Sequence, residues 1–331
     1  MRTADLEAAW ARALKILSNA PQICLACHVR PDADALGSML AVAHALRATG
    51  RPVRVLPSFG DEPFEVPGIL RFLPGVDLLT QPGDYPPQPG VMVTFDAAGP
   101  DRLGLLAPCA ARADELIVLD HHASNAGFGT VRLLDPAAPA TAVLARDLVS
   151  RLGVELTRDI ALCLYAGLVT DTGSFKFSTT PQVHRLAAEL LATGIDPGEV
   201  AHELFDRAPF GYLGLLAAVL SRAVLEPRAA VGHGLVWAAV TSDDRARCGL
   251  ALDAVEPVID VLRRTDEAEV AVVLKESDGG DWLVSARSKG LVDVGRACQA
   301  LGGGGHARAA GFTAAGQPAE VLAALRERLG T

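Results

Sequence analysis

The stretch ICLACHVRPDADALGS, residues 23 to 38, decides the fold of the first half of the chain. An apolar run of strand length ends at His28, two aspartates follow at Asp32 and Asp34, and helical spacing of apolar residues begins near Ala35. A strand, a turn with polar side chains and a helix make up the repeating unit of an open α/β sheet. The same letters contain C-x-x-C-H, the attachment motif of c-type haem, so His28 has two competing interpretations.

The rest of the chain weakens the haem interpretation. The N-terminal stretch MRTADLEAAWARALKILSNAP predicts an amphipathic helix rather than a signal peptide, and no uncharged apolar run has the length of a membrane span. We therefore expect a cytoplasmic protein without membrane contact, where haem is not attached to cysteines. No second C-x-x-C completes a zinc site. Because strand residues alternate between faces, Cys24 and Cys27 would point to opposite sides, and we interpret both as strand core.

Composition limits the class of protein. A chain of 331 residues with 50% hydrophobic content can form two domains with cores of their own. The net charge of -9 and the aromatic content of 5% argue against a protein that coats long single or double strands of nucleic acid, which needs a basic surface. A short anionic ligand in a local basic pocket remains compatible with these values.

The pattern of apolar runs predicts two α/β domains. In the first half, four strand-like runs alternate with helix-like segments, which predicts a parallel sheet: QICLACH, RPVRVLP, GVMVTFD and ELIVLD. Helices broken by Pro and Gly follow, and then the runs GLVWAAVT, EVAVVLKE and DWLVSAR, of which the last two are joined by the hairpin signal SDGG. We expect a catalytic domain at residues 1–190, a helical connector at 191–224 and a smaller mixed α/β domain at 225–331.

Histidines and aspartates follow several of the predicted strands. The candidate metal ligands are two imidazoles and four carboxylates: His28, Asp32, Asp34, Asp96, His121 and Asp171. Because ligands bind at the carboxyl ends of strands in open α/β sheets, these groups can converge. Oxygen and nitrogen donors without thiolate suit two adjacent Mn²⁺ or Mg²⁺ ions, which would activate water for phosphoryl displacement. Each aspartate also has a purely structural interpretation, since Asp32 or Asp34 could simply cap the following helix.

Taken in order, these motifs resemble a known family. The four elements His28-x-x-x-Asp32-x-Asp34, Asp96, Asp120-His121-His122 with Asn125, and Asp171-Thr-Gly are similar to the motifs of the DHH phosphoesterases. The run SARSKGLVDVGRACQALGGGGHARAAGF resembles the DHHA1 domain of that family. The size and the two-domain layout resemble the group of bifunctional oligoribonucleases and 3'-phosphoadenosine 5'-phosphate phosphatases, which also contains hydrolases of cyclic di-AMP and of linear pApA.

The resemblance implies roles for particular residues. The six candidate ligands would hold two Mn²⁺ ions, with Mg²⁺ or Co²⁺ as substitutes, and Asp96 would bridge them. His122 would contact the scissile phosphate, and Asp120 would orient a ligand through a hydrogen bond. In the C-terminal domain a local excess of basic residues surrounds the glycine cluster. The substrate-binding residues implied there are Arg287, Ser288, Gly303, Gly304, Gly305 and His306, where glycine N–H groups and an arginine fork could bind phosphate.

The expected function is therefore two-metal hydrolysis of short oligoribonucleotides and small nucleotides. The sequence does not rank oligoribonucleotide, 3'-phosphoadenosine 5'-phosphate, pApA and cyclic di-AMP as substrates, and it leaves room for a homodimer. The alternatives are an exonuclease on long single strands, a pyrophosphatase, and a nucleotide-binding sensor without catalysis. An exonuclease on long strands would need a longer basic groove than this acidic chain suggests. A pyrophosphatase would not need the base-accommodating GGGGH domain, and a sensor without catalysis would not keep all six ligand types.

Overall fold

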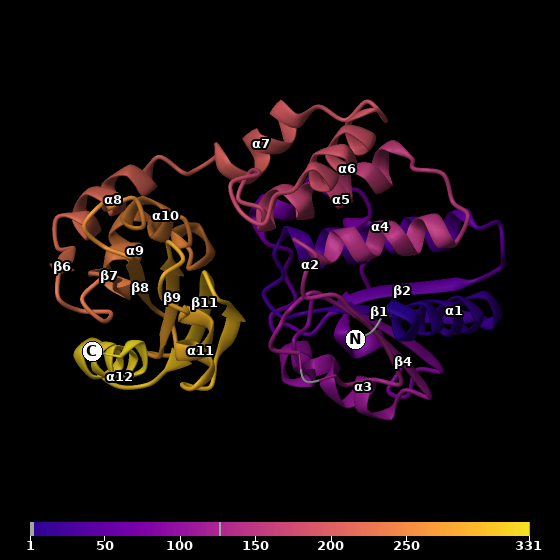
Figure 1. Cartoon of the computed structure of the whole chain (residues 1–331), viewed down its shortest axis with the longest axis horizontal. Helices are drawn as coiled ribbons and strands as arrows, with labels where there is room; N and C mark the ends of the chain where they lie inside the picture. Colours follow the sequence, from indigo (N-terminus) through magenta and orange to yellow (C-terminus); the bar gives the residue numbers. More distant parts are fainter. Residues whose placement is uncertain (1–2, 126, 331) are drawn as a thin grey trace. The chain divides into compact units, whose positions relative to one another are not determined.

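The structure of the chain is a computed structural model that describes residues 3–125 and 127–330. The chain forms two compact units, Met1–Arg207 and Ala208–Thr331, each with its own sheet and core (Figure 1). The expected connector is divided between them, since α7 (Pro197–Phe205) belongs to the first unit and α8 (Gly211–Leu220) to the second. The expected limits at residues 190 and 224 stay predictions.

The first unit contains a five-stranded, all-parallel sheet with the strand order β2-β1-β3-β4-β5. The strands are β1 (Gln22–Cys27), β2 (Arg54–Phe59), β3 (Val91–Phe95), β4 (Glu115–Asp120) and β5 (Val131–Leu134). The predictions of a parallel sheet and of its first four strands are confirmed. The strand β5 has only four residues with alternating burial, so it lacks the apolar run that marks the others.

Helices cover both faces of this sheet (Figure 1). One face packs against α1 (Thr3–Asn19), α2 (Ala33–Ala48), α4 (Thr141–Arg151), α5 (Arg158–Asp171) and α6 (Pro181–Leu191). The other face packs against α3 (Ala107–Arg112) and the 3-10 segment η4 (Pro100–Leu106). Cys27 lies in the first core and Cys24 in the second, both as buried free thiols. The interpretation of this cysteine pair as strand core is confirmed.

One connection of the first unit departs from its expected form. The helix-like stretch after β3 divides into η4 and α3, because Gly104 inside η4 has a left-handed φ of 52°. A Cβ atom at this position would lie 2.5 Å from the carbonyl oxygen of Gly60, so only glycine permits the close approach. Three short 3-10 turns fill the connection between β2 and β3: η1 (Gly68–Leu70), η2 (Val76–Leu78) and η3 (Pro82–Asp84).

The second unit contains a six-stranded mixed sheet with the order β10-β11-β9-β8-β7-β6. Its strands are β6 (Val224–Glu226), β7 (Leu235–Val240), β8 (Val270–Glu276), β9 (Trp282–Ser288), β10 (Gly304–His306) and β11 (Ala309–Ala314). Strands β7 and β8 are parallel, and β8 and β9 form the predicted hairpin. One face packs against α8 and α10 (Val258–Leu262), with α9 (Ser242–Cys248) and η5 (Asp253–Val255) beside them, and the other against α11 (Val294–Gln299) and α12 (Pro318–Leu329).

The prediction of a smaller mixed α/β unit is thus confirmed, while its glycine-rich strands were not expected from the sequence. Among the described residues, no helix is both long and apolar enough to cross a lipid bilayer.

Candidate metal centre

The candidate centre lies at the carboxyl edge of the parallel sheet, where β1, β3 and β4 end side by side. Nε2 of His28 lies 3.5 Å from Oδ2 of Asp96 and 3.9 Å from Oδ2 of Asp32. Nε2 of His121 lies 3.5 Å from Oδ1 of Asp96, 3.1 Å from Oδ2 of Asp171 and 4.0 Å from Oδ2 of Asp34. The structure therefore brings together all six residues that the sequence suggests as ligands, because parallel neighbouring strands end at one edge.

Asp96 is the central carboxylate of this cluster. Its Oδ2 faces His28, and its Oδ1 faces His121 and accepts a hydrogen bond of 2.8 Å from the hydroxyl of Thr141. The residue is buried and has a left-handed φ of 56°, a conformation that costs a non-glycine residue on the order of 1 kcal/mol. Its backbone N–H donates to the carbonyl of Leu119 in β4, which holds this turn in place. The two carboxylate oxygens of Asp96 thus face different histidines, Oδ2 facing His28 and Oδ1 facing His121.

The two aspartates of the D-x-D motif hold different positions. Asp32 is the N-cap of α2, and its Oδ1 accepts hydrogen bonds from the backbone N–H groups of Asp34 and Ala35. The capping interpretation is therefore correct for one oxygen of Asp32, while the other oxygen faces His28. A single carboxylate both starts the helix and contributes to the cluster.

Asp34 is fully buried, and its hydrogen bonds come from the N-terminus of α4 and from Ser38 in α2. Its Oδ2 accepts from the N–H of Thr141 at 2.6 Å, and its Oδ1 accepts from the N–H of Ala142 at 2.8 Å and from the hydroxyl of Ser38 at 3.2 Å. Positive helix ends stabilise carboxylates in this way. Thr141 supports both Asp34 and Asp96 and was not predicted from the sequence, because a threonine at a helix start carries no specific signal of such a role.

Backbone carbonyls fix the orientation of two histidines. Nδ1 of His28 lies 2.8 Å from the carbonyl oxygen of Val29, and Nδ1 of His121 lies 3.1 Å from that of Ala138. A carbonyl only accepts, so each Nδ1 carries the proton. Nε2 is then the ring nitrogen that faces the carboxylates, which is how histidines that ligate metals are usually held.

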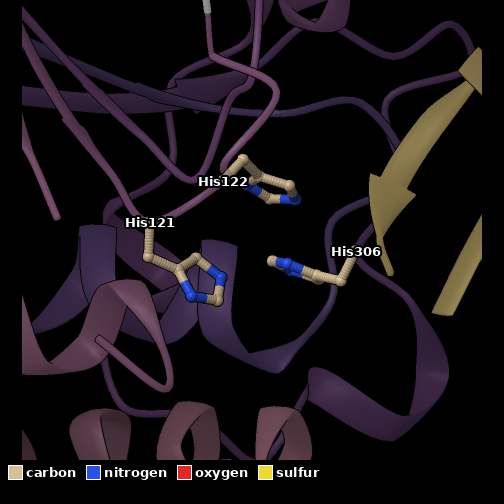
Figure 2. Close-up of side chains that lie close together, drawn as sticks. All are labelled: His121, His122 and His306. Atoms are coloured by element: carbon tan, nitrogen blue, oxygen red, sulfur yellow. The ribbon is translucent and has the colours of Figure 1, made fainter. Parts of the chain in front are cut away.

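His122 is oriented differently, by a buried carboxylate. Its Nδ1 lies 2.7 Å from Oδ1 of Asp120, while Oδ2 of Asp120 accepts a hydrogen bond of 2.6 Å from the side-chain amide of Asn125. Asp120 therefore orients His122, whereas Nδ1 of the ligand candidate His121 bonds the backbone carbonyl of Ala138. The expected role of Asp120 beside a metal ligand stays a prediction. Figure 2 shows the two neighbouring imidazoles, whose planes meet at 69°.

The buried carboxylates and imidazoles of the cluster shift one another's pKa. Burial, together with the charges of Asp171 and Asp96, raises the pKa of Asp34 well above its usual range. Burial also raises the pKa of Asp171, to about 6. Burial opposes the charged form of His121, but the hydrogen bond to Asp171 and the nearby carboxylates outweigh it and raise the pKa of this imidazole. Within the described part of the first unit, the four carboxylates form ion pairs with histidines alone.

A divalent cation fits this donor set. Among the described residues, three overlapping groups of donor atoms within metal-binding range include Asp96: with His28 and Asp32, with Asp34 and His121, and with Asp120 and His122. The donors are carboxylate oxygens and imidazole nitrogens, as Mn²⁺ and Mg²⁺ prefer. Cys27 does not fit as a metal ligand, because burial raises the pKa of its thiol and its side chain belongs to the hydrophobic core.

The candidate substrate-binding residues of the second unit lie around β9 and β10. Arg287 is partly buried on β9, and its Nη1 donates to the carbonyl of Ala286. The hydroxyl of Ser288 donates to Oε1 of Glu269 at 2.8 Å, and the same oxygen accepts from the N–H groups of Gly290 and Leu291 at 2.7 Å. Glu269 therefore fixes the loop that follows Arg287, a role that no sequence motif indicates.

The glycine cluster is part of the sheet rather than a free loop. A Cβ atom at Gly303 would lie 2.1 Å from the carbonyl oxygen of Gly311, and one at Gly305 would lie 2.5 Å from that of Ala309. These glycines allow β10 to pack closely against β11. At Gly304, by contrast, a Cβ atom would meet nothing within 4 Å. His306, labelled in Figure 2, ends β10.

Comparisons with known proteins place the chain in a family. Residues 22–168 match the N-terminal domain of the DHH family, and residues 246–331 match the DHHA1 domain. The bifunctional oligoribonuclease and PAP phosphatase NrnA of Thermus thermophilus is 35% identical over 93% of this chain and 90% of its own length. The cyclic-di-AMP phosphodiesterase GdpP of Geobacillus thermodenitrificans is 25% identical over 88% of this chain and 44% of its own.

A solved structure shares the fold. The exopolyphosphatase-related protein from Bacteroides fragilis superimposes with a TM-score of 0.84 over 98% of this chain and 96% of its own, at 22% sequence identity. Family matches, a relative above 30% identity over nearly its full length and a shared fold agree with the cluster of buried carboxylates and histidines. The chain belongs to the DHH family with a C-terminal DHHA1 domain and is a phosphoesterase, hence a hydrolase.

Proposed function

We propose that the protein is a Mn²⁺-dependent phosphoesterase of short oligoribonucleotides that also removes the phosphomonoester of 3'-phosphoadenosine 5'-phosphate. Linear pApA and cyclic di-AMP are further candidate substrates. The substrate class is supported by the oligoribonuclease and PAP phosphatase of Thermus and the cyclic-di-AMP phosphodiesterase of Geobacillus to which the chain is similar. The observation that carries the proposal is Asp96, whose two oxygens face two separate histidines.

Asp96 would bridge two metal ions. One ion would be held by Asp96 with His28 and Asp32, and the other by Asp96 with Asp34, His121 and Asp171, which lie on the corresponding sides of the carboxylate. When bound, two divalent ions supply Lewis acidity that lowers the pKa of water and stabilises charge on phosphoryl oxygens. Thr141 and the N-terminus of α4 keep Asp96 and Asp34 in position for this task.

His122 would act on the scissile phosphate. Asp120 accepts a hydrogen bond from Nδ1, and Nε2 would contact a phosphoryl oxygen or hold a proton for the leaving group. Burial disfavours the imidazolium, but the hydrogen bond to Asp120 and the charge of Asp96 outweigh burial and raise the pKa of His122. A charged imidazole stabilises the developing negative charge.

The second unit would bind the rest of the nucleotide. Arg287, with Ser288 and His306, would contact a phosphate or a base remote from the bond that is cleaved, and Gly304 leaves open space over its backbone for such a group. Remote contacts of this kind orient the reacting phosphate and contribute to turnover as well as affinity.

Asp96→Asn tests the bridging role. Asparagine tolerates the left-handed backbone of this position, so the variant changes the donor chemistry without adding strain. We expect turnover of all four substrates to fall by about 10³-fold or more, and bound Mn²⁺ to decrease. The matched control is Asp135→Asn, since Asp135 follows the neighbouring strand β5 and its carboxylate accepts a hydrogen bond from the local N–H of Ala137.

Full activity in Asp96→Asn would refute the two-metal site. The values of kcat/KM for a dinucleotide, 3'-phosphoadenosine 5'-phosphate, pApA and cyclic di-AMP would rank the substrates. A wild type that binds these nucleotides tightly without releasing product would instead favour the sensor.

A further inference from the structure

Three loops at the carboxyl edge of the first sheet are joined by hydrogen bonds. The N–H of Val29 donates to the carbonyl of Arg102 at 2.8 Å, and the N–H of Leu105 donates to that of Gly60 at 3.0 Å. The N–H of Arg30 donates to the carboxylate of Asp61 at 2.6 Å. Because Val29 follows the candidate ligand His28 directly, these bonds fix the backbone of both arginines next to the metal centre.

Arg102 has an unusual position for a cation. Its side chain is partly buried, and within residues 3–125 and 127–330 its guanidinium makes neither a hydrogen bond nor an ion pair. Asp32 and Asp96 are near enough for their charges to act on it, and so is the like charge of Arg30. An arginine that lies beside buried carboxylates without pairing with them keeps all five of its N–H donors for another partner.

The backbone of Arg30 is also held in a conformation that keeps a cation beside Arg102. The residue has a left-handed φ of 50°, which is uncommon for a long side chain and costs on the order of 1 kcal/mol. The surrounding hydrogen bonds enforce this conformation, although it keeps Arg30 near a second positive charge. The two guanidiniums lie next to a site for phosphate esters, and the single carboxylate of Asp61 is near enough for its charge to act on both. A phosphate carries more negative charge than this carboxylate and can accept from both forks, so the pair suits a phosphoryl group.

We propose that Arg102, together with Arg30, forms an anion site that binds a phosphoryl group of the substrate on the His28 and Asp32 side of the metal centre. This inference rests on the proposed function, in that the centre acts on phosphate esters. His122 lies beside Oδ1 of Asp96, whereas His28 lies beside Oδ2, so the arginines and His122 would contact the substrate from different sides of the central carboxylate.

The alternative is that Arg102 only balances the negative charge of the carboxylates. The two roles differ in what the removal of the guanidinium changes. An anion site loses affinity for phosphate and keeps its metal. A charge-balancing residue loses fold stability or changes the metal content and leaves phosphate affinity as it was.

The test compares Arg102→Ala and Arg102→Lys with Arg47→Ala in the Mn²⁺-loaded full chain. Arg47 is the matched control, because it is exposed at the opposite end of α2 from the cluster. Inorganic phosphate is the probe, and its dissociation constant is measured by calorimetry and by inhibition of dinucleotide hydrolysis. Bound Mn²⁺ and the melting temperature without phosphate are recorded for every variant.

We expect Arg102→Ala to weaken phosphate binding and to lower kcat/KM by about 10-fold to 100-fold, with metal content unchanged. Lysine keeps the charge but lacks the two-pronged geometry, so Arg102→Lys should restore only part of the loss. Phosphate affinity in Arg102→Ala equal to that in Arg47→Ala overturns the proposal, whatever the melting temperature.

The two proposals fail separately. If the wild type hydrolyses none of the substrates and phosphate binding still depends on Arg102, the proposed function is wrong and the anion site is correct. If the wild type hydrolyses the substrates and the affinity for phosphate does not depend on Arg102, the anion site is wrong and the proposed function is unaffected.

Discussion

Replacing Asp120 with asparagine tests how His122 is held. Asp120 is fully buried, and its two oxygens accept from Nδ1 of His122 at 2.7 Å and from Asn125 at 2.6 Å. Asparagine has the same shape but only one acceptor oxygen, so it can satisfy one of these donors and presents an N–H group to the other. The variant therefore loses either the bond to His122 or the bond to Asn125, and it loses the negative charge in both cases.

The size of the expected losses in kcat and in stability follows from the type of hydrogen bond that is removed. A hydrogen bond between charged partners contributes about 1.5–3 kcal/mol, which corresponds to a loss of about 10-fold to 100-fold in kcat if it is realised in the transition state. A buried donor without an acceptor costs about 1–3 kcal/mol of folding stability. For a unit of this size, a cost of 2 kcal/mol lowers the melting temperature by about 5 °C.

The assay is release of mononucleotide from a dinucleotide and of phosphate from 3'-phosphoadenosine 5'-phosphate, with Mn²⁺ content and melting temperature measured in parallel. The matched control is Asp114→Asn, because Asp114 is exposed and directly precedes β4, the strand that ends in Asp120. We expect equal losses on both substrates, because His122 would act at the phosphorus itself, and an unchanged metal content. A kcat within about twofold of that of Asp114→Asn would refute the proposed role of the Asp120–His122 pair.

Two further predictions concern the second unit. Arg287→Ala should lower kcat/KM on a dinucleotide by about 10²-fold and only slightly on a small chromogenic phosphodiester, whereas equal losses on both would contradict remote binding. Burial opposes the charged form of Asp244, but hydrogen bonds from Arg222 and Thr241 outweigh it and lower its pKa to about 2. A carboxylate with a depressed pKa stabilises the fold at pH values above its unfolded-state pKa, and this stabilisation is lost as the pH falls through the folded-state pKa. Urea unfolding near pH 6 should therefore give Asp244→Asn a free energy of unfolding about 2 kcal/mol below that of the wild type. This difference should shrink towards pH 2. A difference in the free energy of unfolding that does not change with pH would show that the charge of Asp244 is not its cause.

The sequence contained the local signals of the parallel sheet. A strand buried on both faces needs a largely apolar run, and β1, β3 and β4 each have one, so they could be predicted from the sequence. The edge strand β2 has a shorter apolar pattern around Val55 and Leu56, which also indicated a strand. The strand β5 alternates over four residues, and β10 consists of two glycines and a histidine, so neither has a recognisable local pattern. Their pairing depends on neighbours distant in the chain.

The sequence by itself determined which side chains could ligate a metal and at which edge of the sheet they would meet, because strand ends and residue types are local properties. Only the tertiary structure decided which oxygen of Asp96 faces which histidine and that Asp120 holds His122 rather than His121. It alone placed Thr141 against Asp34, 107 positions away in the chain. Such contacts are set by the packing of α4 against α2 and by the register of parallel strands, which the chain fixes only when it is folded.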